Sequence, residues 1–334
     1  DHIHIEYYIF TDDEVGNKIK DILIRKARQG IEVRFIFDDF GSHGLHKKML
    51  AELKQGGVKV AAFYKVRLYA LANRMNYRNH RKIIVIDGNI GFVGGINMDD
   101  RYINNGKHKL FWRDTHLKFE GAAVWNLQYT FMSDWHFCCK EQIEVDKRYF
   151  DFDTEFENNK TCNSLLQIAT SGPDSTRASI MLYFLGLIIA FTERLYITTP
   201  YFIPNETIID ALKHMALSGV DVRLLVPGKS DSRIVNAASC SNYEDLLDAG
   251  VRIYRYQKGF VHAKAIVADN TLSVIGSANM DVRSFDFNFE INALVFDNSI
   301  NNQLCAEFME DIKHSVQLDA EKWNNRSRRY KFGE

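Results

Sequence analysis

One polar motif occurs twice in this chain, and it constrains the fold more than any other feature. The stretch 78-RNHRKIIVIDGNIGFVGGINMDDR-101 is matched, position by position, by 260-FVHAKAIVADNTLSVIGSANMDVR-283. A repeated hydrophobic core would reproduce apolar positions, whereas this repeat also reproduces histidine, lysine, aspartate and asparagine. The repeat therefore predicts two structural units that each carry a polar site. The recurring residues are His80, Lys82, Asp87 and Asn97 in the first copy, and His262, Lys264, Asp269 and Asn279 in the second.

The elements around the motif repeat as well. Each half opens with a strand-like run (3–10 and 195–202), followed by a helix that starts near Thr11 or Asp12 in the first half and near Pro204 in the second. Strands alternating with helices are typical of parallel β-α-β units with helices on both faces of a sheet. We therefore predict an α/β fold with two mixed sheets related by a pseudo-twofold axis, with halves at 1–150 and 151–334. The matching strands expected next are 31–37 and 220–226, then 58–64 and 251–256, separated by helices at about 43–56 and 235–249.

Each motif begins a predicted hairpin. In the run 82–93, a two-residue turn at Gly88 and Asn89 would place His80 opposite Asn97. The same reasoning, with a turn at Asn270 and Thr271, places His262 opposite Asn279. Residues two apart on a strand share a face, so each histidine and the lysine after it point the same way. An imidazole, an ammonium and a carboxamide are thus expected to converge in each half.

The convergent groups fit phosphoryl chemistry. Lysine, asparagine and the Ser277 hydroxyl can donate hydrogen bonds to phosphate oxygens. One histidine can attack phosphorus while the other protonates the leaving oxygen. No pair of carboxylates stands beside the motif to hold a metal, so we predict no metal and no required cofactor. Glu290 and Asp114, each at the start of a strand-like run after its motif, are the predicted carboxylates that orient the two histidines.

Asp87 and Asp269 complete the repeated pattern and are included among the predicted catalytic residues. Their place at a hairpin turn favours a turn-stabilising role over direct chemistry.

The bulk composition limits the partners. A net charge of −1 over 334 residues argues against a protein-wide nucleic-acid surface. Five cysteines follow no metal-ligand spacing and their odd number is a poor disulfide framework, which indicates reduced thiols and a cytosol-facing compartment. No apolar run reaches membrane-span length. The chain begins at Asp1, and this sequence does not decide whether a membrane anchor precedes it or what the oligomeric state is.

Four segments have two interpretations each. The run 180–191 is a buried core helix or a surface that dips into lipid, and 125–137 is core or an amphipathic membrane-facing helix. The loop 65–79 is solvated or contacts substrate, and the tail 324–332 is solvated or touches anionic lipid. Arg78 and Arg81 flank the first histidine and are candidates for headgroup binding.

The motif resembles that of the phospholipase D superfamily, H-x-K-x4-D followed by G-x2-N, which occurs here twice in full. The segments 76-NYRNHRKIIVIDG-88, 94-GGINMDDRY-102, 111-FWRDTHLKFEG-121 and 197-ITTPYFIPNE-206 are similar to bacterial cardiolipin synthases. The resemblance implies a duplicated phospholipase D-like domain with the active site between the halves. It also implies transfer of a phosphatidyl group between two phosphatidylglycerol molecules at a bacterial cell membrane. The products are cardiolipin and glycerol, formed through a phosphohistidine.

Carried onto this chain, the resemblance makes His80 the favoured nucleophile and His262 the acid and base. Lys82, Lys264, Asn97, Asn279 and Ser277 would hold the phosphate. Gly95 stands where Ser277 stands in the second copy, which suggests unequal roles for the two half-sites. Alternatives are a phospholipase D-type hydrolase, a phosphatidylserine synthase-like transferase, a phosphodiester nuclease and a catalytically inactive lipid-binding scaffold.

Overall fold

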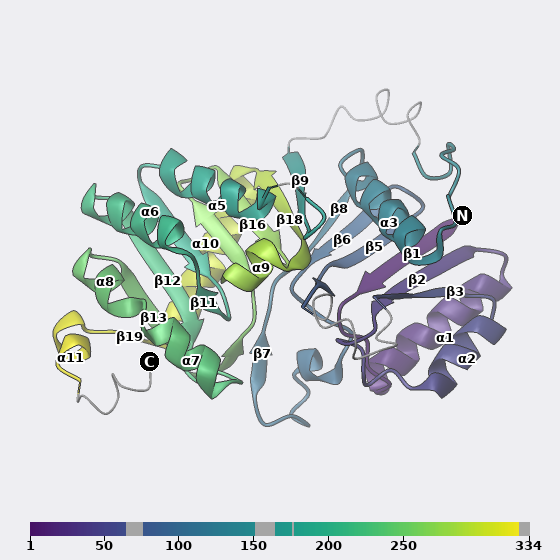
Figure 1. The fold of residues 1–334 in the computed structure, drawn as a ribbon, viewed down its shortest axis with the longest axis horizontal. Helices are drawn as coiled ribbons and strands as arrows, with labels where there is room; N and C mark the ends of the chain where they lie inside the picture. The colour runs from purple at the N-terminus through teal and green to yellow at the C-terminus, as the bar shows by residue number, and fades with distance from the viewer. Residues whose placement is uncertain (65–75, 151–163, 176, 327–334) are drawn as a thin grey trace.

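The computed structural model describes residues 1–64, 76–150, 164–175 and 177–326. Within these ranges the chain forms two large mixed sheets, one in each half, that lie next to each other (Figure 1), together with two short two-stranded sheets. The predicted boundary at residue 150 adjoins residues that are not described, and the division into 1–150 and 151–334 stays a prediction.

The first sheet has six strands in the order β3-β2-β1-β5-β6-β8. Strands β1, β2 and β3 are parallel, and the remaining strands are added in antiparallel fashion. The strands are β1 (His2–Tyr7), β2 (Glu32–Asp38), β3 (Lys59–Phe63), β5 (Lys82–Ile86), β6 (Ile90–Gly94) and β8 (His116–Glu120).

The second sheet repeats this order as β13-β12-β10-β15-β16-β18, again with three parallel strands followed by antiparallel ones. The same order and directions in both halves confirm the predicted duplication. Strand β19 extends one edge, whereas β9 and β4 pair with β18. The strands are β9 (Leu165–Ser171), β10 (Arg194–Thr198), β12 (Asp221–Pro227), β13 (Arg252–Tyr256), β15 (Ala265–Ala268), β16 (Leu272–Gly276), β18 (Asn288–Phe296), β19 (Ser315–Gln317) and β4 (Arg78–Asn79).

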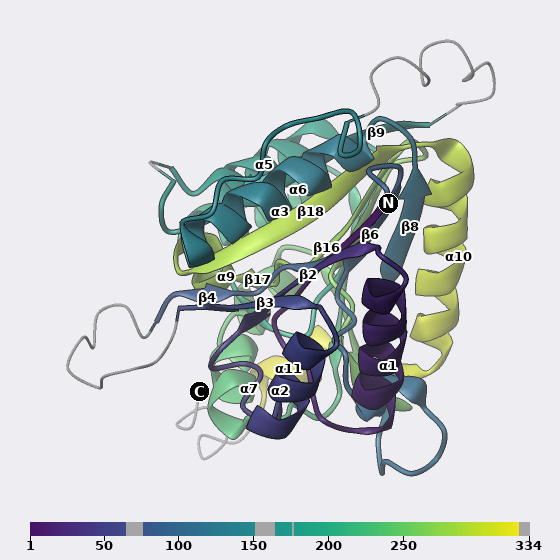
Figure 2. The same ribbon diagram turned by 90° about the vertical axis from the view of Figure 1, so that its right-hand side faces the viewer.

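Helices cover both faces of each sheet. Figure 2 shows α3 of the first half on the same side of the molecule as α5 and α6 of the second, whereas α1 lies on the side of α10, as a twofold relation requires. The second predicted helix of the second half is in fact two helices, α7 and α8. The helices are α1 (Glu14–Arg28), α2 (Lys47–Gln55), α3 (Val124–Cys139), α5 (Ser179–Ala190), α6 (Glu206–Leu217), α7 (Arg233–Cys240), α8 (Tyr243–Asp248), α9 (Val282–Asp286), α10 (Asn298–Lys313), α11 (Ala320–Asn324) and the 3-10 turn η2 (Asp100–Ile103).

The starts of the first helices follow from side-chain capping. Asp13 caps α1 by accepting a hydrogen bond from Gly16 N, and Asn205 caps α6 by accepting one from Ile208 N. Pro204 therefore lies just before the helix that it was predicted to begin.

A shared hydrophobic core joins the halves. One buried cluster combines Ile83, Val85 and Val93 of the first sheet with Ile291 and Ala293 of β18. Because the same apolar cluster contains residues from both sheets, the halves are packed as one body, and this packing fixes the two motifs relative to each other.

Burial bears on two of the ambiguous segments. Phe131 and Trp135 of α3 are buried, which favours the core interpretation of 125–137, whereas Tyr129 and Phe137 of the same helix are exposed. Helix α5 buries Phe184 and Ile188 but leaves Ile189 55% exposed, so only one of its sides belongs to the core. No helix in the described ranges combines the length and apolar character that crossing a bilayer requires. Residues 65–75 of the predicted basic loop and 327–332 of the tail lie outside the described residues.

Both motif hairpins have three-residue turns, so the predicted register was wrong by one residue. Ile86 pairs with Ile90, and Ala268 pairs with Leu272. Asp87 and Asp269 adopt left-handed backbone conformations with φ of 54° and 43°, which lengthens each turn by one residue. The ladder also ends before His80, since β5 begins at Lys82, and no strand pairing places His80 opposite Asn97.

Candidate active site

Two short crossover ladders position the histidines. Strand β4 pairs in parallel with β18, so that Asn79 lies beside Phe289, and β14 (Gly259–Val261) pairs in parallel with β7 (Phe111–Arg113), so that Val261 lies beside Arg113. One residue further along each ladder, a histidine of one half meets a carboxylate of the other. Backbone hydrogen bonds continue both ladders to that point: His80 N donates to Phe289 O at 2.9 Å, and His262 N donates to Arg113 O at 2.7 Å.

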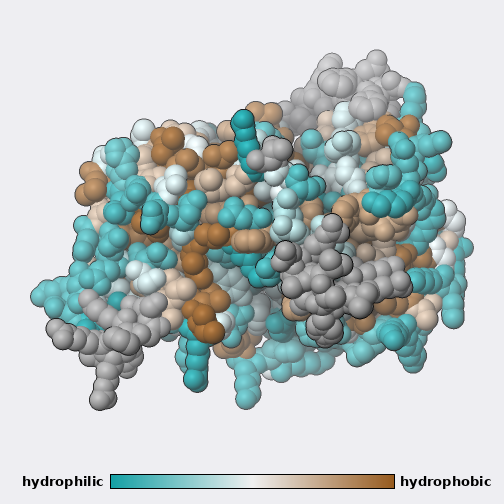
Figure 3. Space-filling model, in the orientation of Figure 1, coloured by the Kyte–Doolittle hydropathy of each residue, from teal (hydrophilic) through white to brown (hydrophobic). Residues whose placement is uncertain are grey.

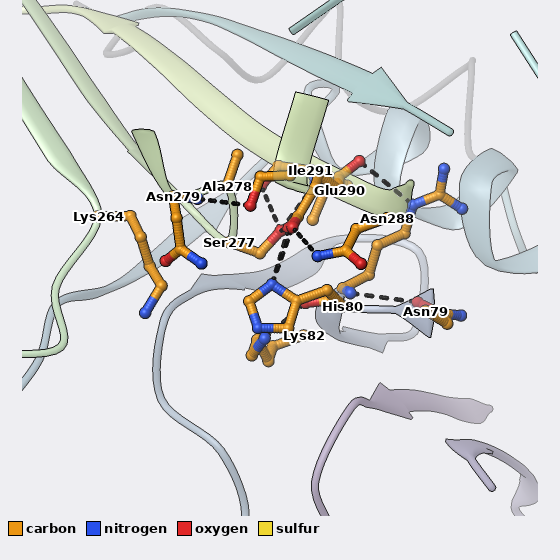
Figure 4. A network of polar contacts seen from close by, with 12 residues as sticks. Asn79, His80, Lys82, Lys264, Ser277, Ala278, Asn279, Asn288, Glu290 and Ile291 are labelled. Atoms are coloured by element: carbon orange, nitrogen blue, oxygen red, sulfur yellow. Dashed lines mark hydrogen bonds and ion pairs between the residues drawn. The ribbon is translucent and has the colours of Figure 1, made fainter. Parts of the chain in front are cut away.

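Each half therefore supplies the carboxylate that contacts the histidine of the other half. Nδ1 of His80 lies 3.0 Å from both carboxylate oxygens of Glu290 (Figure 4). Nδ1 of His262 lies 2.7 Å from Oδ2 of Asp114. A carboxylate can only accept, so each Nδ1 carries the proton and each Nε2 keeps its lone pair.

The electrostatics favour neutral imidazoles facing ionised carboxylates. Burial lowers the pKa of His80 to about 4 and that of His262 to about 3. Burial opposes ionisation of Glu290, but His80 and Lys82 outweigh it and lower the pKa of Glu290 to about 2. The pKa of Asp114 is also lowered, because the pull of His262 and Lys264 exceeds the effect of burial. Both Nε2 atoms are thus available as nucleophile or base at neutral pH.

The two lysines lie beneath the histidines, buried from solvent. Lys82 Nζ donates to the His80 carbonyl at 2.5 Å, and Lys264 Nζ donates to the carbonyl of His262. Burial lowers the pKa of Lys82 to about 7 and that of Lys264 to about 8. Lys264 Nζ also lies 2.9 Å from Nδ1 and 3.1 Å from Nε2 of His262, contacts that the first half lacks between Lys82 and the His80 ring.

Both histidines line one pocket. This cavity of about 460 Å³ lies between the halves and is also lined by Asn97 and Asn279. Asn97 donates to the Tyr102 hydroxyl at 2.9 Å, whereas the Oδ1 atom of Asn279 is buried without a hydrogen-bond partner among the described residues. One cavity with both imidazoles is what a single reaction shared by the two motifs requires.

Ser277 lies elsewhere than predicted. Its hydroxyl donates to Oε2 of Glu290 at 2.5 Å, and it is fully buried beside β18, away from the pocket lining (Figure 4). The hydroxyl is thereby committed to holding the carboxylate. In the first half, a Cβ on Gly95 would lie 2.2 Å from Oδ1 of Asp114, so the absence of a side chain makes room for that shorter carboxylate. The difference between Gly95 and Ser277 therefore follows from the length of the carboxylate in each half-site.

Asp87 and Asp269 are structural by position. Asp87 Oδ1 accepts from His2 N at 2.8 Å, and Asp269 Oδ1 accepts from Glu193 N and Arg194 N at 2.9 Å each. Each carboxylate ties its hairpin turn to the start of the half's first strand. Neither lines the pocket, and their contacts fit the turn-stabilising interpretation better than direct catalysis.

Arg81 lies outside the pocket, whereas two tyrosines lie beside the histidines. Arg81 is buried in an ion pair with Asp134 and does not reach the pocket, unlike Arg78. Tyr8 packs its ring edge against His80 at 4.8 Å, and the Tyr102 hydroxyl lies 3.3 Å from Nδ1 of His262. The sequence reasoning missed both tyrosines because they lie outside the repeated motif pattern. Among the described residues, no three His, Cys, Asp or Glu side chains are arranged to hold a metal ion.

The fold and the paired motifs define the class of protein. A family model described as "Cardiolipin synthase, PLD-like domain" matches residues 1–121 and 187–312. These ranges cover more than half of the chain, and the chain therefore belongs to this family.

Named relatives narrow the comparison. The chain is 44% identical over 325 residues to "Cardiolipin synthase 2" of Bacillus anthracis, which covers 97% of this chain and 62% of the relative. It is also 44% identical over 333 residues to "Cardiolipin synthase" of Geobacillus kaustophilus (strain HTA426), covering 100% of this chain and 66% of the relative. The chain thus spans somewhat less than two thirds of the length of these relatives.

Solved structures agree on the fold. A phosphatidylserine synthase of Haemophilus influenzae Rd KW20 superposes with a TM-score of 0.70 at 14% identity, covering 99% of this chain and 86% of that chain. A polyphosphate kinase of Porphyromonas gingivalis gives a TM-score of 0.59 at 11% identity, covering 96% and 44%. At these identities the likeness concerns the fold alone.

Proposed function

We propose that this chain catalyses cardiolipin synthesis, transferring a phosphatidyl group from one phosphatidylglycerol to another and releasing glycerol. The observation that carries the proposal is the single pocket in which two neutral imidazoles are each held by a carboxylate of the opposite half. The identity of 44% to relatives named cardiolipin synthase supports the choice of substrate.

In the first step, Nε2 of His80 attacks the phosphorus of the first phosphatidylglycerol. The bond from phosphorus to the headgroup oxygen breaks, and that oxygen takes a proton from His262 as glycerol leaves. His262 takes up this proton from solvent at Nε2 when the substrate binds, because the negative charge of the phosphate favours the imidazolium form and raises the pKa of His262 above its value in the empty pocket. Lys82, Lys264, Asn97 and Asn279 supply positive charge and hydrogen-bond donors to the phosphoryl oxygens.

In the second step, a headgroup hydroxyl of the second phosphatidylglycerol gives its proton to His262 as its oxygen attacks phosphorus. The phosphorus–nitrogen bond to His80 breaks and cardiolipin is released. The proton lost in the first step is thereby recovered, and the enzyme returns to its starting state. The protein's own groups carry all the charge in this scheme, so the reaction is proposed to need no cofactor.

His80 is the favoured nucleophile on local grounds. Its Nδ1 is held by both oxygens of Glu290, and Ser277 and Asn288 hold that carboxylate in turn at 2.5 and 3.0 Å. The ammonium of Lys264, by contrast, lies 2.9 Å from Nδ1 and 3.1 Å from Nε2 of His262. A positive charge this close to an imidazole makes it the poorer nucleophile of the two, so His262 is left the role of proton carrier.

A bacterial cell membrane is the proposed location of the substrate, with the catalytic part facing the cytosol. An open apolar groove of about 540 Å³ runs along α5 and is lined by Leu182, Leu187, Leu294 and Phe296. Figure 3 shows hydrophobic side chains gathered over α5. This surface supports contact with phospholipid.

The products test the proposal. Purified chain incubated with phosphatidylglycerol vesicles should yield cardiolipin and glycerol in equal amounts, with or without a metal chelator. Phosphatidic acid as the main product would instead identify a hydrolase, and phosphatidylserine formed when serine is added would identify a different transferase. Cleavage of DNA without any lipid product would identify a nuclease.

A further inference from the structure

The pocket has a cationic end that the repeated motif does not account for. Arg78 and Arg283 both line the cavity, and the repeat makes Arg283 the counterpart of Arg101. Arg101 is neutralised, because its Nε and Nη2 atoms donate to Asp99 at 2.8 and 3.0 Å. Arg101 also lies over the Trp112 ring at 4.7 Å.

Arg283 is in a different state. Asp281, the counterpart of Asp99, is used to cap α9 by accepting from Ser284 N at 2.6 Å. Within the described residues, the Arg283 side chain forms no ion pair or hydrogen bond, and it is exposed at the pocket. The second half therefore presents a full positive charge where the first half presents a neutral pair.

Arg78 adds a second, buried cation. It is only 4% exposed, its guanidinium lies over the Phe40 ring at 4.2 Å, and Nη1 donates to Tyr77 O. Its Nε atom has no hydrogen-bond partner among the described residues. The nearby Asp38 carboxylate accepts from the backbone N–H groups of Asn79 and Gly41 and forms no ion pair with Arg78.

The two arginines lie near the same side of the pocket. Arg78 pairs with Asn288 where β4 lies beside β18, and the helix that carries Arg283 ends just before Asn288, with Phe287 N donating to Arg283 O at 3.0 Å. The repeat gives Phe260 as the counterpart of Arg78, so the other end of the pocket lacks this charge. That other end is aromatic instead, with Trp112, Tyr102 and Tyr201.

We propose that Arg78 and Arg283 bind the phosphate of the second phospholipid, the acceptor. This inference rests on the proposed function. The motif lysines and asparagines already serve the phosphate that reacts, and neither water nor glycerol as acceptor carries a charge that needs two more cations. Phosphatidylglycerol as acceptor carries a second phosphate, linked through single bonds that let its hydroxyl lie at the histidines while the phosphate contacts the arginines. Two guanidinium groups suit such a diester, because each can donate two parallel hydrogen bonds.

The test compares two acceptors with the same hydroxyl chemistry, of which only one carries a phosphate. Cardiolipin formation uses phosphatidylglycerol as acceptor, whereas exchange of labelled glycerol into phosphatidylglycerol uses neutral glycerol. Arg283→Ala should lower cardiolipin formation about 10- to 100-fold, the loss expected when a hydrogen bond to a charged group is removed, and leave glycerol exchange within about twofold. Arg283→Lys should restore part of the loss. Arg28→Ala, on the exposed end of α1, should change neither rate.

The other outcomes overturn the inference. An equal fall in both rates would give Arg283 a role with the donor or the fold, and unchanged rates would remove the second phosphate site. Arg78→Lys supplies a second variant that keeps the charge but loses the bidentate geometry, and it too should reduce cardiolipin formation more than exchange. If the wild-type chain exchanges glycerol but forms no cardiolipin, the proposed function itself fails, which is a distinct result.

Discussion

The two half-sites share one backbone plan but differ in what surrounds each histidine. In both, a short parallel ladder between the halves ends where a histidine meets the other half's carboxylate. His80 faces Glu290 and a Ser277 hydroxyl, whereas His262 faces Asp114 and a lysine ammonium near its Nε2 atom. Duplication thus provides symmetric positions, and side-chain differences provide unequal electrostatics. A reaction that needs one nucleophile and one proton carrier requires both.

The largest effect on activity is expected when the histidine of each half-site is replaced separately. His80→Ala and His262→Ala should each lower cardiolipin formation by about 10³-fold or more, because nucleophile and proton carrier act in the same pocket. Initial rates with phosphatidylglycerol, together with melting temperatures to show that the variants fold, provide the measurement. Retention of more than a tenth of the activity by either variant would contradict a shared reaction.

Replacing each carboxylate with its amide tests the connection between the halves. Glu290→Gln and Asp114→Asn should each lower kcat by about 10- to 100-fold with little change in KM, since a hydrogen bond to a charged group contributes about 1.5–3 kcal/mol. Adding Glu290→Gln to His80→Ala should cost little more, because the carboxylate acts through that histidine. Full additivity of the two changes would show that Glu290 does not act through His80.

Replacing Gly95 with serine, the residue at the matching position of the second half, should damage the first half-site. Gly95→Ser places a Cβ against the Asp114 carboxylate, which occupies the space beside Gly95. Overpacking of this kind typically costs about 1–3 kcal/mol of folding stability. Activity should fall about tenfold, because the added side chain displaces Asp114 from His262. Ser277→Gly, which copies the first half into the second, should have a smaller effect, because Asn288 still donates to Glu290. A larger loss for Ser277→Gly than for Gly95→Ser would reverse this ordering.

The lysines set the expected pH dependence. Burial lowers the pKa of Lys82 to about 7 and that of Lys264 to about 8, and the charged forms are those that bind phosphate. Activity should therefore be retained below these values and lost as pH rises through them, by about tenfold per pH unit for each lysine required. A profile of kcat/KM against pH measures this limb. A flat profile up to pH 10 would show that neither lysine titrates in this range.

The duplicated fold could be read from the sequence because strand and helix signals recur in the same order around a repeated polar motif. Glu290 and Asp114 could be singled out because each begins a strand-like run after its motif. The pairing of each histidine with a carboxylate of the other half could not be predicted. It depends on the crossover strands β4 and β14, which have two and three residues and leave no periodic signal in the sequence.

Two other features escaped the sequence for physical reasons. The hairpin register depends on a left-handed backbone conformation at Asp87 and Asp269. Aspartate can adopt this conformation, but the presence of an aspartate does not predict it. The hydroxyl of Ser277 was expected at the phosphate, and its commitment to Glu290 follows from packing against a strand distant in sequence.

Trapping the covalent intermediate tests the shared pocket most directly. Phosphatidylglycerol labelled in its phosphate, mixed with the chain and quenched rapidly, should leave one phosphatidyl adduct, which peptide mass spectrometry should locate at His80. The adduct should vanish in His80→Ala. An adduct on a residue outside the two histidines, or turnover without any phosphohistidine, would contradict the account.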